Sequence, residues 1–122
     1  VLTHAVCEAL LGALALGDLG RIFPDTDPRY QGVSSLELLR GVTELVGANG
    51  GRPVNVDATV ICQVPRLAPY LDEMASRLAE TVRVKAGRVS VKAKSPGHLG
   101  LLGREEGIAA MAVVAVEVNS LS

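Results

Sequence analysis

The sequence predicts an α/β protein, an α+β sandwich in which helices pack on a mixed β-sheet. Apolar residues recur every three or four positions in three segments, and they alternate with polar residues in two others. Hydrophobic residues make up 48% of the 122 residues and charged residues 20%, as in globular proteins. We therefore expect residues 1–122 to form one domain in the order helix, loop, helix, strand, helix, strand, strand.

Three segments have helical spacing. Residues 2–14 are apolar on nearly all sides, so we expect this helix to be buried on several faces. The next helix begins at Ser34, whose side chain can accept a hydrogen bond from the Glu37 N–H in a capping box, and it ends at residues 49–51. The third covers residues 67–82, with a proline in its first turn.

Three later segments are predicted strands. Residues 54–62 and 88–94 alternate between apolar and polar side chains, as half-buried strands do. Residues 108–118 are dominated by Ala and Val, so we expect a central strand that is covered on both faces. Because this strand and the first helix carry more apolar surface than a small domain easily covers, we expect a homo-oligomer.

Composition and charge exclude several classes of partner. The formal net charge is −1 and the basic residues are spread along the chain, so there is no basic field for duplex nucleic acid. Aromatic residues make up 2% and Trp is absent, so a bound nucleobase would have to lie between aliphatic groups and backbone. No signal sequence or membrane-spanning run is present, and we expect a cytoplasmic protein without a membrane partner.

The two cysteines lie in apolar segments. Cys7 is within the first helix and Cys62 ends the first strand, with no CxxC spacing. Cysteine in such a context behaves as a small hydrophobic residue. We expect both to be buried, and neither a disulfide nor a cysteine metal site is indicated.

A loop rich in glycine, proline and aspartate follows the first helix. Residues 17–28 contain two glycines, two prolines and three aspartates. Glycine lets backbone N–H groups approach a ligand, proline stiffens the chain, and carboxylates accept hydrogen bonds from sugar or polyol hydroxyls. This composition is typical of a ligand-binding loop, and an ordinary loop between helices is the alternative that it leaves open.

Two further features could carry chemistry. His4 lies one helical turn before Glu8 on the same face, which suits either a metal ligand or an ordinary polar residue. Residues 95–104 join two strands just after Lys92 and Lys94, and they combine glycines, a hydroxyl group and cations. Such a loop suits phosphate oxygens, but it matches neither a P-loop nor a dinucleotide fingerprint, so a loop with solvated charges is equally open.

Taken in order, these pieces resemble the 2-C-methyl-D-erythritol 2,4-cyclodiphosphate synthase family over residues 1–116. The matching segments are His4, residues 9–13, 16–20, 23–28, 55–57, 63–66, 91–93, 99–100 and 103–109. The resemblance implies a homotrimer with active sites between subunits. It also implies a lyase of non-mevalonate isoprenoid biosynthesis, which cyclises a CDP-linked methylerythritol phosphate and releases CMP.

The chemistry that the resemblance implies needs no protein nucleophile. The substrate's own 2-phosphate attacks the β-phosphoryl group, so the enzyme positions the substrate and neutralises charge. The implied cofactors are divalent metals, a zinc-like ion at His4 and magnesium or manganese at the diphosphate.

The resemblance also assigns site residues. His4 corresponds to a metal-binding histidine, Ser95 to a threonine that steadies the phosphoryl transition state, and Arg104 to a substrate-contacting arginine. The residues of the methylerythritol and phosphate cradle would be Asp18, Leu19, Gly20, Phe23, Pro24, Asp25, Thr26 and Asp27. The residues of a mostly backbone-built cytidine pocket would be Cys62, Pro65, Arg66, Leu67, Ala68, Ala93 and Lys94.

The chain departs from the family pattern at several positions. It begins at Val1 inside a helical pattern, so we interpret it as the C-terminal portion of a longer protein, without the family's N-terminal strands and metal motif. Gly97 stands where the family has an acidic residue and Leu101 where it has Phe, while His98 is either a replacement ligand or a solvated histidine. The alternative function is therefore a catalytically incomplete trimeric scaffold, or a fragment, that binds cytidine nucleotide without turnover.

Overall fold

The computed structural model describes residues 1–24, 29, 33–62, 67–95 and 108–119. The elements are α1 (Leu2–Ala13), α2 (Leu19–Ile22), α3 (Ser35–Ala48), β1 (Gly51–Ile61), α4 (Leu71–Val82), β2 (Val89–Lys94) and β3 (Ala109–Val118), with short 3₁₀ turns at Ala68–Tyr70 and Ala86–Arg88. This order confirms the sequence-based prediction. The addition is α2, which forms inside the segment expected to be a loop.

The strands form a mixed sheet with the order β2-β1-β3. β1 and β2 are parallel and are connected through α4, whereas β3 runs antiparallel to β1. The predicted alternation holds in β1, where Val56, Ala58 and Val60 are buried. The mixed sheet packed on helices is therefore confirmed.

The expected position of β3 is wrong. β1 is the central strand, and β3 lies at an edge of the sheet in the part of the chain that the structure describes. Ala110, Ala112, Val114 and Val116 pack toward the core. On the opposite face Met111 is 62% exposed and Val113 71% exposed. A continuous apolar run is typical of a strand covered on both faces, but within this chain the helices cover only one.

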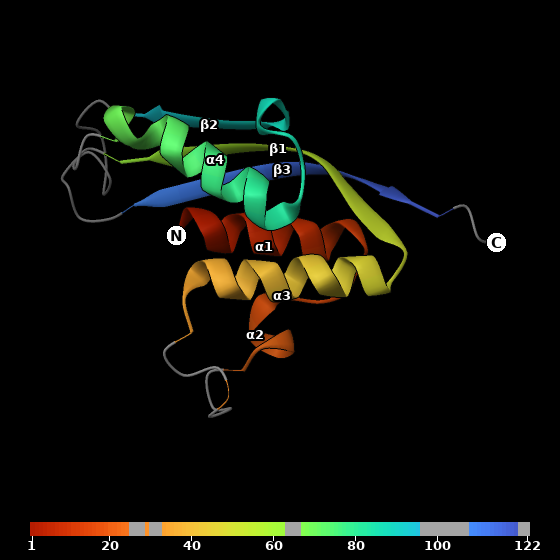
Figure 1. Cartoon of the computed structure of the whole chain (residues 1–122). Coiled ribbons are helices and arrows are strands. Elements are labelled where there is room, and N and C mark those ends of the chain that lie inside the picture. The colour runs from red at the N-terminus through yellow and green to blue at the C-terminus, as the bar shows by residue number, and fades with distance from the viewer. Residues whose placement is uncertain (25–28, 30–32, 63–66, 96–107, 120–122) are drawn as a thin grey trace.

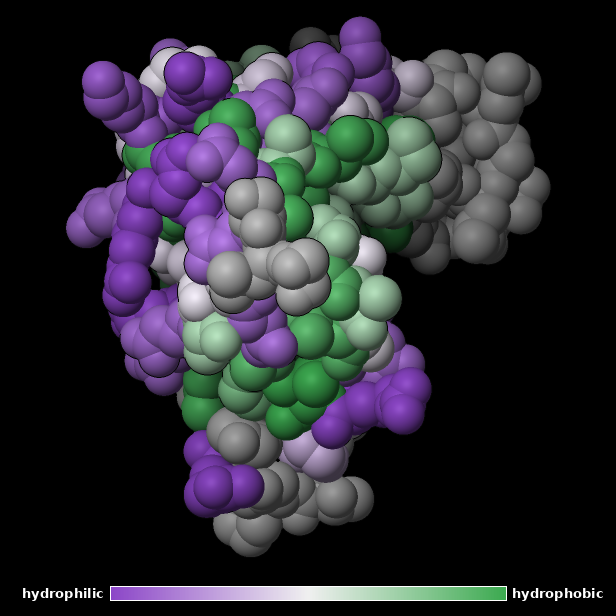
Figure 2. Space-filling model, turned by 90° about the vertical axis from the view of Figure 1, so that its right-hand side faces the viewer, coloured by the Kyte–Doolittle hydropathy of each residue, from purple (hydrophilic) through white to green (hydrophobic). Residues whose placement is uncertain are grey.

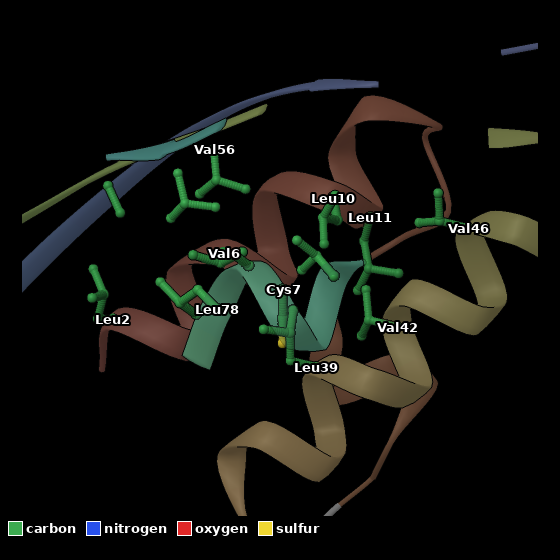
Figure 3. Close-up of a cluster of buried hydrophobic side chains, with 14 of the residues drawn as sticks. Leu2, Val6, Cys7, Leu10, Leu11, Leu39, Val42, Val46, Val56 and Leu78 are labelled. Carbon is green, nitrogen blue, oxygen red and sulfur yellow. The ribbon is translucent and has the colours of Figure 1, made fainter. Parts of the chain in front are cut away.

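The helices form a layer against the sheet (Figure 1). α1 packs on β3 and β1, α4 packs on β2, and α3 packs on both helices. The core in Figure 3 is built around α1, whose Val6, Cys7, Leu10 and Leu11 are fully buried beside residues of α3, α4 and β1. α1 is therefore buried on several sides, as predicted. None of the helices in the described residues has the length and apolar character needed to cross a membrane.

The two helix ends expected at α3 are confirmed. Ser34 Oγ accepts a hydrogen bond from the Glu37 N–H at 3.2 Å, as the capping box predicts. Asn49 closes the C-terminus, and Gly50 follows with φ +81°. Because glycine adopts this left-handed conformation without strain, the chain turns directly from α3 into β1.

The two cysteines differ in how deeply they are buried. Cys7 is fully buried in the core, whereas Cys62 is only half-buried, so the prediction of a buried thiol is wrong at Cys62. No disulfide joins them, as expected. Cys62 is less buried because it lies just past the end of β1, at the margin of the sheet.

Candidate functional site

The predicted cytidine-pocket residues that the structure describes lie where the parallel strands end. Ile61 pairs with Lys94 in the β1–β2 register, and the Cys62 N–H donates a hydrogen bond to the Lys94 carbonyl oxygen at 3.0 Å. Leu67 and Ala68 begin the 3₁₀ turn that leads into α4 at this edge. The carboxyl ends of parallel strands are common ligand sites, because backbone groups there are not all used by the sheet.

Ser95 directly follows β2 and is exposed beside Lys94. This places a hydroxyl group and a primary amine next to the carboxyl ends of β1 and β2. Lys92 is engaged elsewhere: its Nζ lies 2.8 Å from Asp57 Oδ1 on the outer face of the sheet. Of the two lysines that suggested a phosphate site, Lys94 is therefore the one positioned at the edge.

His4 lies at the same end of the molecule. It is exposed in the first turn of α1, whose N-terminus points toward the end where β1 and β2 finish (Figure 1). Glu8, one turn later, accepts a hydrogen bond through Oε1 from the Leu19 N–H. No group of three or more His, Cys, Asp or Glu side chains that could hold a metal occurs among the described residues. The described residues around His4 therefore do not fit a complete metal site.

The predicted cradle begins with a capped turn. Gly17 has φ +102°, and Asp18 is the N-cap of α2, where Oδ1 accepts a hydrogen bond from the Arg21 N–H at 2.9 Å. Asp18 and Gly20 are exposed, and Leu19 is half-buried. This leaves the Asp18 carboxylate at the surface with a second oxygen available for a ligand hydroxyl.

Phe23 serves a packing role in this segment. It packs against the hydrophobic core, with its ring next to Gly41 of α3. Its N–H donates to the Leu19 carbonyl oxygen at 2.8 Å. Phe23 therefore fixes the end of α2, with Pro24 following it half-buried at the surface.

Among the described residues, the structure does not bring the predicted cradle and the predicted cytidine edge together. Figure 1 places α2 on the far side of α1 and α3 from the sheet. The strand ends carry Cys62, Ala93 and Lys94 on the other side of this helix layer. The described residues of the two regions therefore do not form one pocket within the chain.

The predicted site residues outside the described part of the chain are Asp25, Thr26, Asp27, Pro65, Arg66 and Arg104. Gly97, His98 and Leu101 also lie outside it. Sequence reasoning missed one polar pocket, on the outer face of the sheet, which is lined by Asn55, Val56, Asp57, Gly87, Arg88, Ser90 and Lys92. The sequence signal that could have revealed this pocket is the set of polar residues that alternate with apolar ones in β1 and β2.

Comparison with known proteins places these features in a family. The model of the YgbB family matches residues 1–117. The chain belongs to the YgbB family. The match covers every element from α1 to β3 except the last residue of β3, so the helices and strands described above are those of this family.

Two relatives of this YgbB chain are named 2-C-methyl-D-erythritol 2,4-cyclodiphosphate synthase. The one from Syntrophobacter fumaroxidans is 54% identical over 114 residues, which are 93% of this chain and 72% of the relative. The one from Thioalkalivibrio sulfidiphilus is 55% identical over 117 residues, 96% of this chain and 73% of the relative.

A solved structure shares the YgbB fold. It is described as 2C-methyl-D-erythritol-2,4-cyclodiphosphate synthase in a CDP-bound form. Its TM-score is 0.86 at 32% sequence identity, over 94% of this chain and 74% of that chain. The mixed sheet and its helices are therefore arranged as in a solved synthase.

Proposed function

We infer that this chain is a 2-C-methyl-D-erythritol 2,4-cyclodiphosphate synthase, a lyase of isoprenoid precursor biosynthesis. The observation that carries this is the 54–55% identity to synthases over 93–96% of the chain. The CDP-bound solved structure with the same fold agrees with it. A non-catalytic scaffold is not favoured, because relatives this similar are named as enzymes.

The reaction is an intramolecular phosphoryl transfer. An oxygen of the substrate's 2-phosphate forms a new bond to the β-phosphorus of the CDP moiety. The bond from that phosphorus to the oxygen bridging the α- and β-phosphates breaks, and CMP leaves with the bridging oxygen. Because the nucleophile belongs to the substrate, the protein's contribution is to fold the substrate back on itself and to stabilise developing charge.

The cytidine end of the substrate is proposed to bind at the ends of β1 and β2, through residues Cys62, Pro65, Arg66, Leu67, Ala68, Ala93 and Lys94. The hydrogen bond between Cys62 and Lys94 supports this, because it holds the two backbone segments at one edge. Backbone N–H and C=O groups can recognise a base edge without aromatic stacking. This suits a chain with 2% aromatic residues.

The methylerythritol end is proposed to bind residues Asp18, Leu19, Gly20, Phe23, Pro24, Asp25, Thr26 and Asp27. The exposed Asp18 carboxylate supports this, because a carboxylate accepts hydrogen bonds from vicinal hydroxyls. Ser95 is proposed to steady the transition state by donating a hydrogen bond from its hydroxyl group to a phosphoryl oxygen. Arg104 is proposed to contact the diphosphate.

Divalent metal is proposed as the cofactor, with a zinc-like ion at His4 and magnesium or manganese at the diphosphate. Such ions neutralise phosphate charge when bound. The described residues offer no group of three or more side chains that could hold a metal, so further ligands would have to come from outside them.

A homotrimer with active sites between subunits is proposed as the assembly. Two observations support it: the cradle and the cytidine edge are separated by the helix layer, and β3 exposes Met111 and Val113. Figure 2 shows a continuous hydrophobic area on the side of the molecule where β3 ends, beside hydrophilic side chains. Sedimentation velocity tests the assembly, since a monomer at micromolar concentration would contradict it.

The activity is tested by incubating the native full-length protein with 4-CDP-2-C-methyl-D-erythritol 2-phosphate and a divalent metal. We expect stoichiometric release of CMP and the cyclic diphosphate, measured by chromatography and ³¹P NMR. Absence of turnover in a folded, metal-loaded protein would reject the function.

A further inference from the structure

Glu8 joins α1 to the segment that starts the proposed cradle. Its Oε1 accepts a hydrogen bond from the backbone N–H of Leu19 at 2.5 Å, across eleven positions of the sequence. Glu8 is exposed on α1, and it belongs to none of the proposed site residues. The bond therefore ties a side chain of the rigid core helix to the backbone between Asp18 and Gly20.

The chain between the two helices makes an unusual turn. Ala15 has φ +54° and Gly17 has φ +102°, both in the left-handed region. A left-handed alanine is strained, so it persists only where surrounding contacts hold it. The Leu16 N–H donates to the Leu11 carbonyl oxygen at 2.9 Å and holds the first half of this turn.

The second half of the turn depends on side chains. Asp18 Oδ1 accepts from the Arg21 N–H at 2.9 Å. The Leu19 N–H lies in the first turn of α2, where backbone N–H groups have no partner within the helix. Glu8 supplies the acceptor that α2 lacks. Without it, side-chain packing such as that of Leu19 against the core would still hold α2 near α1, but the hydrogen bond that fixes the Leu19 backbone to α1 would be lost.

This contact sets the position of the cradle relative to His4. Glu8 and His4 are four residues apart on α1, so they lie on one face of the helix. We propose that Glu8 is a positioning residue, which holds the backbone of Asp18–Gly20 at a fixed position relative to His4. The methylerythritol end of the substrate then binds in the orientation that the reaction needs. This inference rests on the proposed function.

Two variants separate this role from others. Glu8→Ala removes the acceptor, and we expect the KM for substrate to rise about tenfold, as loss of one hydrogen bond to a charged group allows, with kcat within about threefold of wild type. Glu8→Gln keeps an acceptor oxygen, and we expect its KM to stay within about threefold of wild type. The matched control is Glu80→Ala, because Glu80 is also an exposed glutamate on a helix, α4. This variant should leave KM and kcat unchanged.

Amide hydrogen exchange at Leu19 measures the hydrogen bond between Glu8 and the Leu19 N–H directly, and it needs no substrate. We expect Leu19 protection to fall in Glu8→Ala and to persist in Glu8→Gln and Glu80→Ala. A thermal melt confirms that each variant is folded, and metal content should be the same in all three. Bound CMP should have the same affinity in Glu8→Ala as in wild type, because the proposed cytidine edge lies beyond the helix layer.

The outcomes distinguish this inference from the proposed function. Unchanged KM and unchanged Leu19 exchange in Glu8→Ala, with wild type releasing CMP, would overturn the inference alone. Equal KM defects in Glu8→Gln and Glu8→Ala, together with lost metal, would replace it by a metal-ligand role. Absence of CMP release by wild type would overturn both.

Discussion

Gly41 of α3 lies against the ring of Phe23, where a Cβ atom at position 41 would be 3.0 Å from the ring Cζ. Phe23 is the only phenylalanine in the chain. It lies at the end of α2, in the first part of the proposed cradle. The absence of a side chain at Gly41 therefore lets this segment sit close on α3. The relationship connects a helix interior to the proposed substrate site.

Gly41→Ala should weaken substrate binding more than it changes stability. Alanine favours a helix interior over glycine by about 1 kcal/mol, but the added methyl group would displace the Phe23 ring at a comparable cost. We expect a small change in the free energy of unfolding and a several-fold higher KM. Gly47→Ala is the control, because no atom lies within 4 Å of a Cβ at that position. It should raise stability and leave KM unchanged. Equal KM values for the two variants would contradict the proposed role of Phe23.

Asp18→Ala should weaken substrate binding without unfolding the protein. Loss of an N-cap costs about 1 kcal/mol at most helix ends. Here α2 is one short turn with no fully buried residue, so little of the core depends on it. We expect about a tenfold rise in KM, measured by CMP release, and a small shift in melting temperature. Asp18→Asn keeps the cap and removes the charge, so it should preserve the melting temperature and still raise KM. A large loss of thermal stability with unchanged affinity would refute this role.

His4→Ala should lower the metal content of the purified protein. The exposed imidazole at the start of α1 is the proposed ligand, and loss of one ligand weakens a metal site. Metal per chain is measured by plasma mass spectrometry after dialysis. His98→Ala, at the other histidine of the chain, tests whether that residue is a replacement ligand or a solvated side chain. Unchanged metal stoichiometry in His4→Ala would exclude the assignment.

Stability should fall at alkaline pH because of Cys7. Burial of the thiol, with the charge of Glu8 adding to it, raises the pKa of Cys7 from 9.0 to about 12. The folded protein then holds the thiol proton more tightly than the unfolded chain, so this contribution is complete below pH 9 and is lost as the pH rises toward 12.

Urea unfolding measured between about pH 8 and pH 11 checks this, and the expected slope from Cys7 is about 1.4 kcal/mol per pH unit above the unfolded pKa. Cys7→Ala should lose that part of the slope, although it also leaves a small cavity in the core. Cys62→Ala retains Cys7 and should follow the wild-type slope. Identical slopes in wild type and Cys7→Ala would show that the thiol proton does not couple to folding.

The sequence predicted the helices and strands well because their signals are local. The Ser34–Glu37 capping box and the alternation of residues 54–62 depend on neighbours within one turn or one strand, and the structure contains both. It missed α2, because four residues between a cap and a proline have no helical periodicity to detect. It also placed β3 in the centre of the sheet, because an apolar run does not reveal which of its faces another element covers.

For the candidate site, the residue types can be taken from the sequence alone, and their expected roles follow from the ordered resemblance to a family. The YgbB match confirms the family, and the order of helices and strands follows from the same local patterns. Which of these groups lie in contact depends on the folded structure. It brings Cys62 against Lys94 and Glu8 against Leu19, and it separates the cradle from the cytidine edge by the helix layer. The physical reason is that periodicity and capping act over a few residues, whereas these contacts depend on how the sheet and helices pack once the chain has folded.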